Sequence, residues 1–359
     1  MPTVLWWGRF DPDYSRNRIL RKLLADLGWQ VRDFRPRLSG LGDWEARLRA
    51  IPKLDLIWVP CFRQRDVAAA SRWARSHGIP LLFDPLISAY DKQVDERGKL
   101  DADSPRARRL LAWERKLFRR ADRILADTPA HADYFAEKLG ADREKCAVVY
   151  VGAEEALFSP HPMPAKQPEE ALEVLFYGSF IPLQGPSTVI EAARRYRGEP
   201  VKWTLLGNGP LRKTCEEQSA GLRNVVFEDW MPYEQLSARI QQADILLGVF
   251  GTTAKASRVI PNKVFQSLAC GRPVVTRSAG AYPDDLAAEA HSGLVWVPPG
   301  DAQGLADRVA DLASDRDALH QLGLAAGETS RKHFSESEVR RQLSEALDGV
   351  RALIHQSHP

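Results

Sequence analysis

The sequence has few cysteines and lacks long apolar runs. Its 359 residues include four scattered cysteines, with no CxxC pair and no histidine near them at metal-ligand spacing. This excludes a disulfide framework or a cysteine-based zinc site and favours reduced, buried thiols in the cytosol. No stretch of about 18 uninterrupted apolar residues occurs, so we expect no membrane-spanning helix.

A secretory signal is also missing, because the N-terminus MPTVLWWGRF has no basic region followed by a long apolar stretch. We therefore expect a cytoplasmic protein, either soluble or attached to the inner face of the membrane. The net charge is only +3, and no segment has the pattern of a nucleic-acid-reading module, so we expect no nucleic-acid partner.

Short apolar runs alternate with helical periodicity along most of the chain. Helical patterns such as residues 17–27, 67–77, 105–120 and 129–139 separate the expected strands. This alternation predicts an α/β fold made of two Rossmann-like, doubly wound domains, each with a parallel sheet. The expected strands are residues 4–7, 30–34, 56–59, 81–83, 123–126, 147–150, 172–177, 201–206, 225–227, 245–247, 274–275 and 293–296.

A proline-rich stretch from residue 158 to residue 170 has the extended, polar composition of a linker. We assign residues 1–160 to a first domain and residues 161–334 to a second. Helices are expected at residues 301–315 and 335–354, and the segment 335–359 is expected to pack back toward the first domain. Ligands of such sheets lie beyond the carboxyl ends of the strands.

The segment from Gly248 to Thr276 carries the clearest chemical signal. Between two apolar runs it holds a Gly/Thr turn, the cations Lys255, Arg258 and Lys263, and a helix start. Backbone N–H groups at a helix N-terminus and cationic side chains together bind phosphate groups. The pattern predicts a diphosphate site, although an ordinary strand–helix unit with solvated lysines would look the same.

Three glycine-containing turns follow expected strands of the second domain, at residues 178–185, 207–210 and 248–251. A single such turn is a weak signal, since glycine also serves plain tight turns. Because the carboxyl ends of parallel strands share one edge of a sheet, three of them together predict a nucleotide or nucleotide-sugar site.

These motifs resemble the donor domain of GT-B glycosyltransferases, specifically the retaining family 4. The resemblance implies transfer of a hexose-type sugar from a nucleotide diphosphate sugar to a saccharide, lipid-linked or other hydroxyl acceptor, as in the synthesis of cell-surface polysaccharides or glycoconjugates. We expect no cofactor and no metal ion, because no DxD-type carboxylate pair lies at a strand end of the donor domain and side chains supply cations. A GT-B nucleotide-sugar epimerase and a non-catalytic nucleotide-sugar-binding protein remain alternatives. The matching segments are residues 177–185, 206–210, 228–232, 243–245, 259–264, 269–275 and 297–301, with 121–128 and 151–160 before them.

The resemblance also implies site residues. Cations neutralise the diphosphate, backbone groups near Trp230 read the base, and Gln266 takes the place of a ribose-binding glutamate. The chain departs from the family where Arg258 and Gln266 replace a pair of carboxylates eight positions apart, which leaves open a different phosphate clamp or an inactive copy. The donor-binding residues implied are Gly178, Ser179, Phe180, Gln184, Gly185, Gly207, Gly209, Trp230, Met231, Lys255, Arg258, Val259, Ile260, Lys263 and Gln266.

Acceptor-side residues are expected in the first domain. The loop after the first strand would lie near the donor diphosphate, and Ser15 or Asn17 would cap the following helix. Asp84 and Asp91, in the loop after residues 81–83, are the expected catalytic carboxylates that contact sugar hydroxyls, although either could merely cap a turn. The acceptor-side loop residues are Gly8, Arg9, Asp11, Ser15 and Asn17.

Residues 105–123 are rich in Arg and Lys, and their apolar residues form a stripe that predicts a basic amphipathic helix. Such a helix suits an anionic membrane surface, but a solvated charged face explains the pattern equally.

Overall fold

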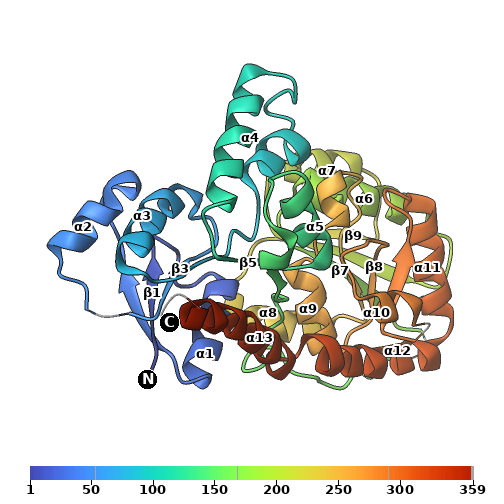
Figure 1. Cartoon of the computed structure of the whole chain (residues 1–359). Coiled ribbons are helices and arrows are strands. Elements are labelled where there is room, and N and C mark those ends of the chain that lie inside the picture. The colour runs from blue at the N-terminus through green and yellow to red at the C-terminus, as the bar shows by residue number, and fades with distance from the viewer. Residues whose placement is uncertain (53, 168, 290, 357–359) are drawn as a thin grey trace. The chain divides into compact units, whose positions relative to one another are not determined.

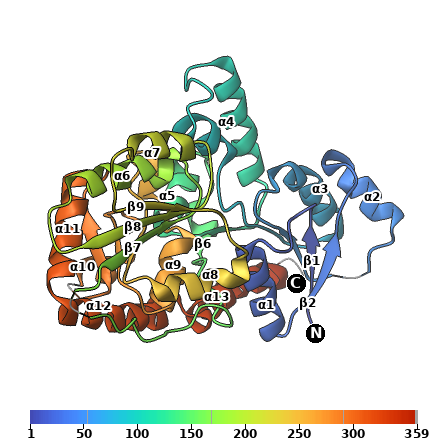
Figure 2. The same cartoon turned by 180° about the vertical axis from the view of Figure 1, so that it is seen from behind.

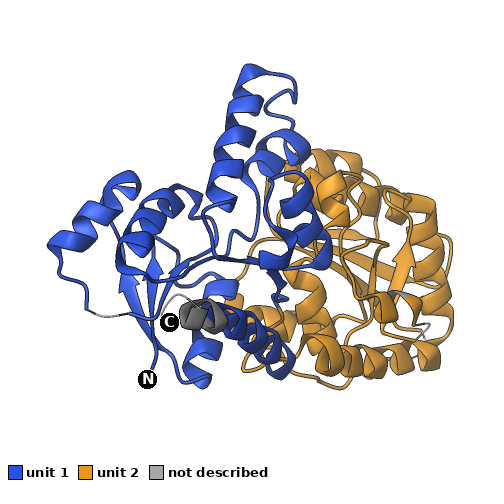
Figure 3. Cartoon of the chain, in the orientation of Figure 1, with its two compact units in different colours: residues 1–151, 336–359 blue, residues 152–335 orange. Residues whose placement is uncertain are grey.

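The computed structural model describes residues 1–52, 54–167, 169–289 and 291–356. The chain divides into two compact units, which Figure 3 shows in different colours. Unit 1 contains residues 1–151 and 336–359, and unit 2 contains residues 152–335. The boundary falls nine residues before the one that the linker composition indicates, because residues 152–160 pack with unit 2.

Unit 1 is built on a six-stranded parallel sheet with the order β2-β1-β3-β4-β5-β6. β1, β3 and β4 consist of buried, mostly apolar residues, as expected for strands of a sheet that is covered on both faces, whereas the edge strand β2 is largely exposed. Figures 1 and 2 show α1 and α13 on one side of the sheet and α2 and α3 on the other. The strands are β1 (Thr3–Trp7), β2 (Gln30–Phe34), β3 (Leu56–Val59), β4 (Leu81–Phe83), β5 (Arg123–Ala126) and β6 (Cys146–Val148).

Local sequence explains where two helices of unit 1 begin. Ser104 and Thr128 precede prolines at the first helical position, and each hydroxyl accepts a hydrogen bond from a backbone N–H three residues later. The helices of unit 1 are α1 (Ser15–Asp26), α2 (Gly42–Leu48), α3 (Val67–His77), α4 (Pro105–Phe118), α5 (Pro129–Glu137) and α13 (Glu336–Gln356), with a π-helical segment at Asp91–Glu96.

α13 joins unit 1 although it follows unit 2 in the sequence. Its residues Val339, Leu343 and Leu347 are buried, and it packs against α1, β5 and β6. Gln342 accepts a hydrogen bond from the backbone N–H of Tyr150 at 3.0 Å.

Unit 2 is built on a second six-stranded parallel sheet, with the order β12-β11-β10-β7-β8-β9. The strand order reverses between β7 and β10, and ligands of doubly wound sheets bind at such a point. The strands are β7 (Leu172–Tyr177), β8 (Val201–Leu206), β9 (Val225–Glu228), β10 (Ile245–Leu247), β11 (Val274–Arg277) and β12 (Leu294–Val297).

The sequence did not predict every helix of unit 2. α12 was missed because Gly323 and Gly327 interrupt its pattern, and α8 and the short α10 were not predicted either. Both sheets nevertheless confirm the predicted α/β class. The helices are α6 (Pro186–Arg195), α7 (Arg212–Gln218), α8 (Tyr233–Gln242), α9 (Asn262–Ala269), α10 (Asp284–Ala288), α11 (Ala302–Ser314) and α12 (Arg316–Thr329). None of the helices in the described ranges is both long and apolar enough to cross a bilayer.

Candidate functional site

The three glycine turns meet at the carboxyl edge of the sheet of unit 2. They follow β7, β8 and β10, the first and last of which flank the point where the strand order reverses. Gly178, Gly185, Gly207 and Gly209 all have φ between 65° and 150°, a region that side chains with a Cβ rarely adopt. The backbone at this edge therefore requires glycine.

Close packing between the turns also requires these glycines. A Cβ at Gly207 would lie 2.1 Å from the carbonyl oxygen of Gly178, and one at Gly209 would lie 2.6 Å from the backbone nitrogen of Phe180. A Cβ at Gly185 would lie 2.8 Å from the backbone nitrogen of Gly251. Contact between the loops thus explains glycine here without a ligand.

Phe180 has a structural role that the sequence did not indicate. Its side chain is buried in the core of unit 2 against Phe176, and its backbone N–H donates to the carbonyl of Asn208 at 2.9 Å. Its carbonyl accepts from Leu211. Since both backbone groups and the ring are engaged inside the protein, the prediction that Phe180 contacts the donor is corrected, whereas Ser179 beside it is exposed.

Lys263 lies in the first turn of α9 and is almost fully buried. Its ammonium group donates to Gln184 Oε1 at 3.0 Å and lies 3.8 Å from the centre of the Phe176 ring. Within the described part of the chain no carboxylate pairs with it. Burial lowers the pKa of Lys263 well below its ordinary value. An amine in this position would gain an ionic partner if an anion bound there.

Further cations surround the third turn. Lys255 is buried in a 3₁₀ turn that Thr253 caps, and Arg258 follows this turn. Arg277, at the end of β11, donates to the carbonyl of Gly251 at 2.7 Å. Arg277 was not among the predicted site residues, and its place at the end of an apolar strand is the signal that could have identified it.

Gln266 is buried on α9 with both ends of its amide engaged. Tyr177 donates its hydroxyl to Gln266 Oε1 at 3.0 Å, and Gln266 Nε2 donates to the hydroxyl of Tyr233 at 3.3 Å. Ile260 just before α9 is also buried, while Val259 is half-buried.

Trp230 and Met231 lie in the loop after β9, at the same edge of the sheet. Trp230 is 58% exposed, and a Cβ added to Gly207 would lie 3.2 Å from its ring. An exposed indole beside the second glycine turn offers an apolar surface of the size of a nucleobase.

In unit 1, Asp84 is not available to a sugar. Its side chain has no exposed surface, and Arg16 Nε donates to its two oxygens at 2.9 and 3.0 Å. Arg16 also donates to the carbonyl of Val149 at 3.0 Å. Burial raises the pKa of Asp84, and the adjacent guanidinium opposes part of this rise. The prediction of a catalytic role for Asp84 is therefore corrected to a structural ion pair.

Asp91 is also fully buried, and its backbone N–H donates to the hydroxyl of Ser88 at 3.1 Å. The same loop is held by Glu114 of α4, which the sequence analysis did not single out. Glu114 accepts hydrogen bonds from the Ser88 hydroxyl and from the backbone N–H groups of Ala89 and Tyr90. Burial raises the pKa of Glu114.

The acceptor-side loop differs from its prediction at the helix cap. Tyr14 occupies the N-cap of α1 and no side chain caps it, so Ser15 and Asn17 lie inside the helix. Asn17 instead donates to the carbonyl of Asp11 at 2.7 Å, which shapes the loop. Arg9 and Asp11 are exposed, and a Cβ at Gly8 would lie 3.1 Å from the Arg63 side chain.

A second buried pair in unit 1, Asp127 and His131, was also missed. Asp127 follows β5, and one of its oxygens lies within hydrogen-bond distance of His131 Nδ1. The spacing of four residues at the start of a helix was the available signal.

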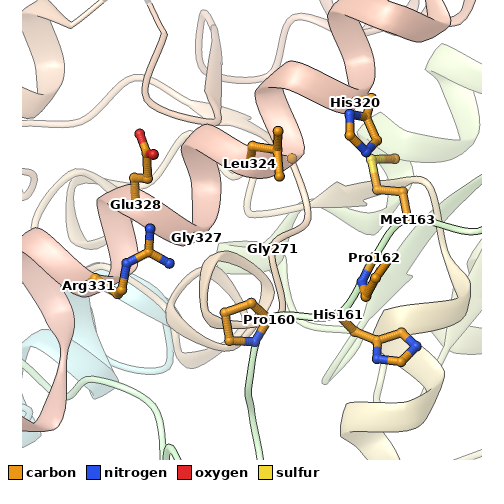
Figure 4. A pocket seen from close by; sticks show the side chains of 11 residues that line it. Pro160, His161, Pro162, Met163, Gly271, His320, Leu324, Gly327, Glu328 and Arg331 are labelled. Carbon is orange, nitrogen blue, oxygen red and sulfur yellow. The ribbon is translucent and has the colours of Figure 1, made fainter.

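A separate cavity of unit 2 lies between residues 160–163 and α12 (Figure 4). It has a volume of about 420 Å³, and its lining includes Gly271, His320, Leu324, Glu328 and Arg331 but no residue of the predicted donor site. A Cβ at Gly323 would lie 3.0 Å from the carbonyl oxygen of Gly271. Glycine on α12 thus permits the close approach of the two segments.

The described residues contain no group of three or more His, Cys, Asp or Glu side chains arranged to hold a metal ion.

Comparison with known proteins identifies relatives of both halves of the chain. The glycosyl transferase 4-like domain model matches residues 12–152, and the glycosyl transferases group 1 model matches residues 171–315. The Escherichia coli K12 protein WcaL, named as a glycosyltransferase of colanic acid biosynthesis, is 30% identical over 244 residues, 66% of this chain and 58% of WcaL. A D-inositol 3-phosphate glycosyltransferase of Segniliparus rotundus is 26% identical over 238 residues, 62% of this chain and 51% of that protein. The chain thus aligns with little more than half the length of these relatives.

Solved structures share the fold at low identity. Sucrose-phosphate synthase from Thermosynechococcus elongatus superposes with a TM-score of 0.74 at 19% identity, over 98% of this chain and 99% of the other. Anabaena HepE, solved in complex with UDP, gives 0.70 at 17% identity, over 97% and 100%. These structures confirm the expected GT-B fold. Because family models match both halves of the chain, the chain belongs to the glycosyl transferases, with a glycosyl transferase 4-like first domain and a glycosyl transferases group 1 second domain.

Proposed function

We propose that this protein transfers a hexose-type sugar from a UDP-sugar to a hydroxyl acceptor, with retention, in the synthesis of a cell-surface polysaccharide or glycoconjugate. The observation that carries the proposal is Lys263, a buried ammonium group at the start of a helix, beside the glycine turns, with an amide as its hydrogen-bond partner. The HepE complex with UDP and the name of WcaL support the donor and the pathway class.

In this proposal the chain stabilises the departing diphosphate. Lys263, Lys255 and Arg258 supply positive charge in partly desolvated positions, where electrostatic stabilisation of a leaving group is strongest. Trp230 packs on the base and Gln266 contacts the ribose. The loop after β1 in unit 1 holds the acceptor hydroxyl for attack, and its exposed polar side chains are Arg9 and Asp11.

A panel of UDP-sugars tests this proposal. We expect release of UDP to require both one donor and a saccharide or lipid-linked acceptor, with product detected by mass spectrometry. Conversion of the donor to an epimer without acceptor would assign the chain to the epimerases. Binding of UDP-sugars with no turnover against any acceptor would make it a binding protein.

Turnover should not depend on a divalent ion, because side-chain cations surround the proposed diphosphate site. We expect the rate in the presence of EDTA to equal the rate in Mg²⁺ or Mn²⁺. Loss of activity in EDTA that Mn²⁺ restores would show that the cations alone do not neutralise the diphosphate.

Gln266→Ala should weaken UDP binding by about 0.5–1.5 kcal/mol if its amide contacts the ribose. Gln266→Glu should retain affinity, because a carboxylate still accepts from the Tyr177 hydroxyl and can accept from the ribose hydroxyls. Calorimetry with UDP measures both variants, and Gln242→Ala on the exposed end of α8 serves as the control. Equal affinity in all of these proteins would place the ribose away from Gln266.

For location, we propose peripheral contact with an anionic membrane through residues 105–123. Part of the expected apolar stripe faces inward, since Leu117, Phe118 and Ala121 are buried, and the exposed Arg106, Arg108 and Lys116 are the lipid-facing candidates.

A further inference from the structure

A cavity of about 750 Å³ in unit 1 lies outside every predicted site residue. Two of the segments that line it follow the neighbouring strands β3 and β4, at the edge of a parallel sheet where ligands bind. The third segment is one face of α4. The lining residues are Phe62, Arg63, Gln64, Arg65, Ala89, Gln93, Arg109, Leu110 and Trp113.

The charge of this cavity is positive and only partly neutralised. Arg63 pairs with the buried Asp66, whose Oδ2 lies 2.5 Å from Arg63 Nη2. For Arg65 and Arg109, the described residues provide neither a hydrogen bond nor an ion pair, and no carboxylate lines the cavity. Guanidinium groups bind phosphate and carboxylate through two parallel hydrogen bonds. The cavity therefore presents two guanidinium groups for an anion.

Aromatic and amide side chains complete the lining. Phe62 is 43% exposed and Trp113 is half-buried, and Tyr14 supports Phe62 through an edge-on ring contact at 5.0 Å. Arg109 and Trp113 are four residues apart on α4, so both project from the same face. Flat apolar surfaces beside a few polar groups are typical of pockets for small organic ligands. The apolar face of a sugar ring fits such a surface.

The loops that carry these groups are fixed in strained conformations. Phe62 and Leu86 are bulky residues with φ of 64° and 58°, a backbone region that is strained for side chains with a Cβ. Hydrogen bonds hold the two loops together, with Gln64 Nε2 donating to the carbonyl of Ile87 at 2.7 Å. Glu114 ties the second loop to α4. The cavity is thus held in shape without a ligand.

We propose that this cavity binds an acceptor sugar that carries a negative charge, either a phosphate or a carboxylate. Arg65 and Arg109 bind the anionic group, and Phe62 and Trp113 pack against the ring. The inference rests on the proposed function, because it specifies the acceptor of that reaction. Gly8 lies against Arg63 and brings the acceptor-side loop to the wall of the cavity.

The test measures binding to the full chain by calorimetry or ligand-observed NMR, with glucose 1-phosphate, glucuronate, glucose and inorganic phosphate as probes. We expect one or both charged sugars to bind at least ~10-fold more tightly than glucose and than phosphate alone. A difference of this size is what one pair of charge-assisted hydrogen bonds contributes to binding. The variant Arg65→Gln/Arg109→Gln should lose this preference, and the exposed α4 variant Arg106→Gln should keep it. Tighter binding of glucose 1-phosphate would identify the anionic group of the acceptor as a phosphate. Tighter binding of glucuronate would identify it as a carboxylate.

UDP binding, measured in the same proteins, separates this inference from the proposed function. If UDP binds and the charged sugars bind no better than glucose, the inference is wrong and the proposed function stands. If the double variant loses binding to vesicles containing phosphatidylglycerol while sugar binding is unchanged, the arginines serve a membrane contact and the inference is also wrong. Failure of UDP to bind, with charged sugars still bound, would reject the proposed function instead.

Discussion

Replacing Arg16 with methionine is expected to lower the free energy of unfolding by about 3–5 kcal/mol, because Asp84 is left buried without its cation. Both side chains are fully buried, and the guanidinium contacts both carboxylate oxygens. Urea unfolding followed by fluorescence measures the loss. Arg21→Met, which removes a more exposed partner of Asp33, serves as the control and should change stability by less than about 1 kcal/mol.

The loss should depend on pH and on Asp84. Without Arg16 the folded-state pKa of Asp84 rises further above its unfolded value, so the penalty is largest at neutral pH and shrinks as pH falls and the carboxyl group takes up a proton. The double variant Arg16→Met/Asp84→Leu should be more stable than Arg16→Met alone. A double variant no more stable than the single one, or a loss independent of pH, would contradict a buried ion pair.

Lys263→Met is expected to weaken UDP binding by about 1.5–3 kcal/mol, roughly 10- to 150-fold, because it removes a desolvated cation from the proposed diphosphate site. Calorimetry measures the affinity, and Lys213→Met on the exposed face of α7 is the control. If Lys263→Met bound UDP with unchanged affinity, the diphosphate would not bind at Lys263.

The same change should not destabilise the free protein. The pKa of Lys263 is lowered in the folded state, so its folded form loses stability as pH falls through that pKa, and the methionine variant avoids this loss. We expect the variant to be at least as stable as the natural chain, with the largest advantage below the folded-state pKa and none near pH 10–11, the unfolded pKa of lysine. A clear drop in stability at neutral pH would mean that Lys263 is a structural residue.

The sequence predicted the sheets well because fully buried parallel strands are read as short apolar runs. Ile245–Leu247 is such a run, and β10 occupies these residues as expected. The sequence did not predict α12. Glycine is needed at position 323 because a Cβ there would lie too close to the carbonyl oxygen of Gly271, and this contact between distant segments cannot be inferred from the local sequence pattern.

A site residue could be predicted where its position relative to a strand in the sequence was sufficient to identify it. Lys263 lies in a basic segment after an apolar strand, and this placement singled it out. The environment of a carboxylate was not predictable, because the partner of Asp84 lies 68 residues earlier in the chain. Phe180 was misassigned for the same reason, since whether a ring in a glycine loop faces the core depends on Phe176 and the rest of unit 2.

The place of α13 has a consequence for the order in which the chain acquires its structure during synthesis. Residues 1–151 leave the ribosome first. Tyr150 and α1, however, contact α13, which is synthesised only after all of unit 2. Domains usually fold as units in the order of synthesis, but here unit 2 is complete earlier. Before α13 is synthesised, the apolar surface of unit 1 that contacts its buried residues remains exposed to solvent. These residues are Val339, Leu343, Ala346, Leu347 and Val350. We expect this nascent intermediate to be prone to aggregation and to bind chaperones.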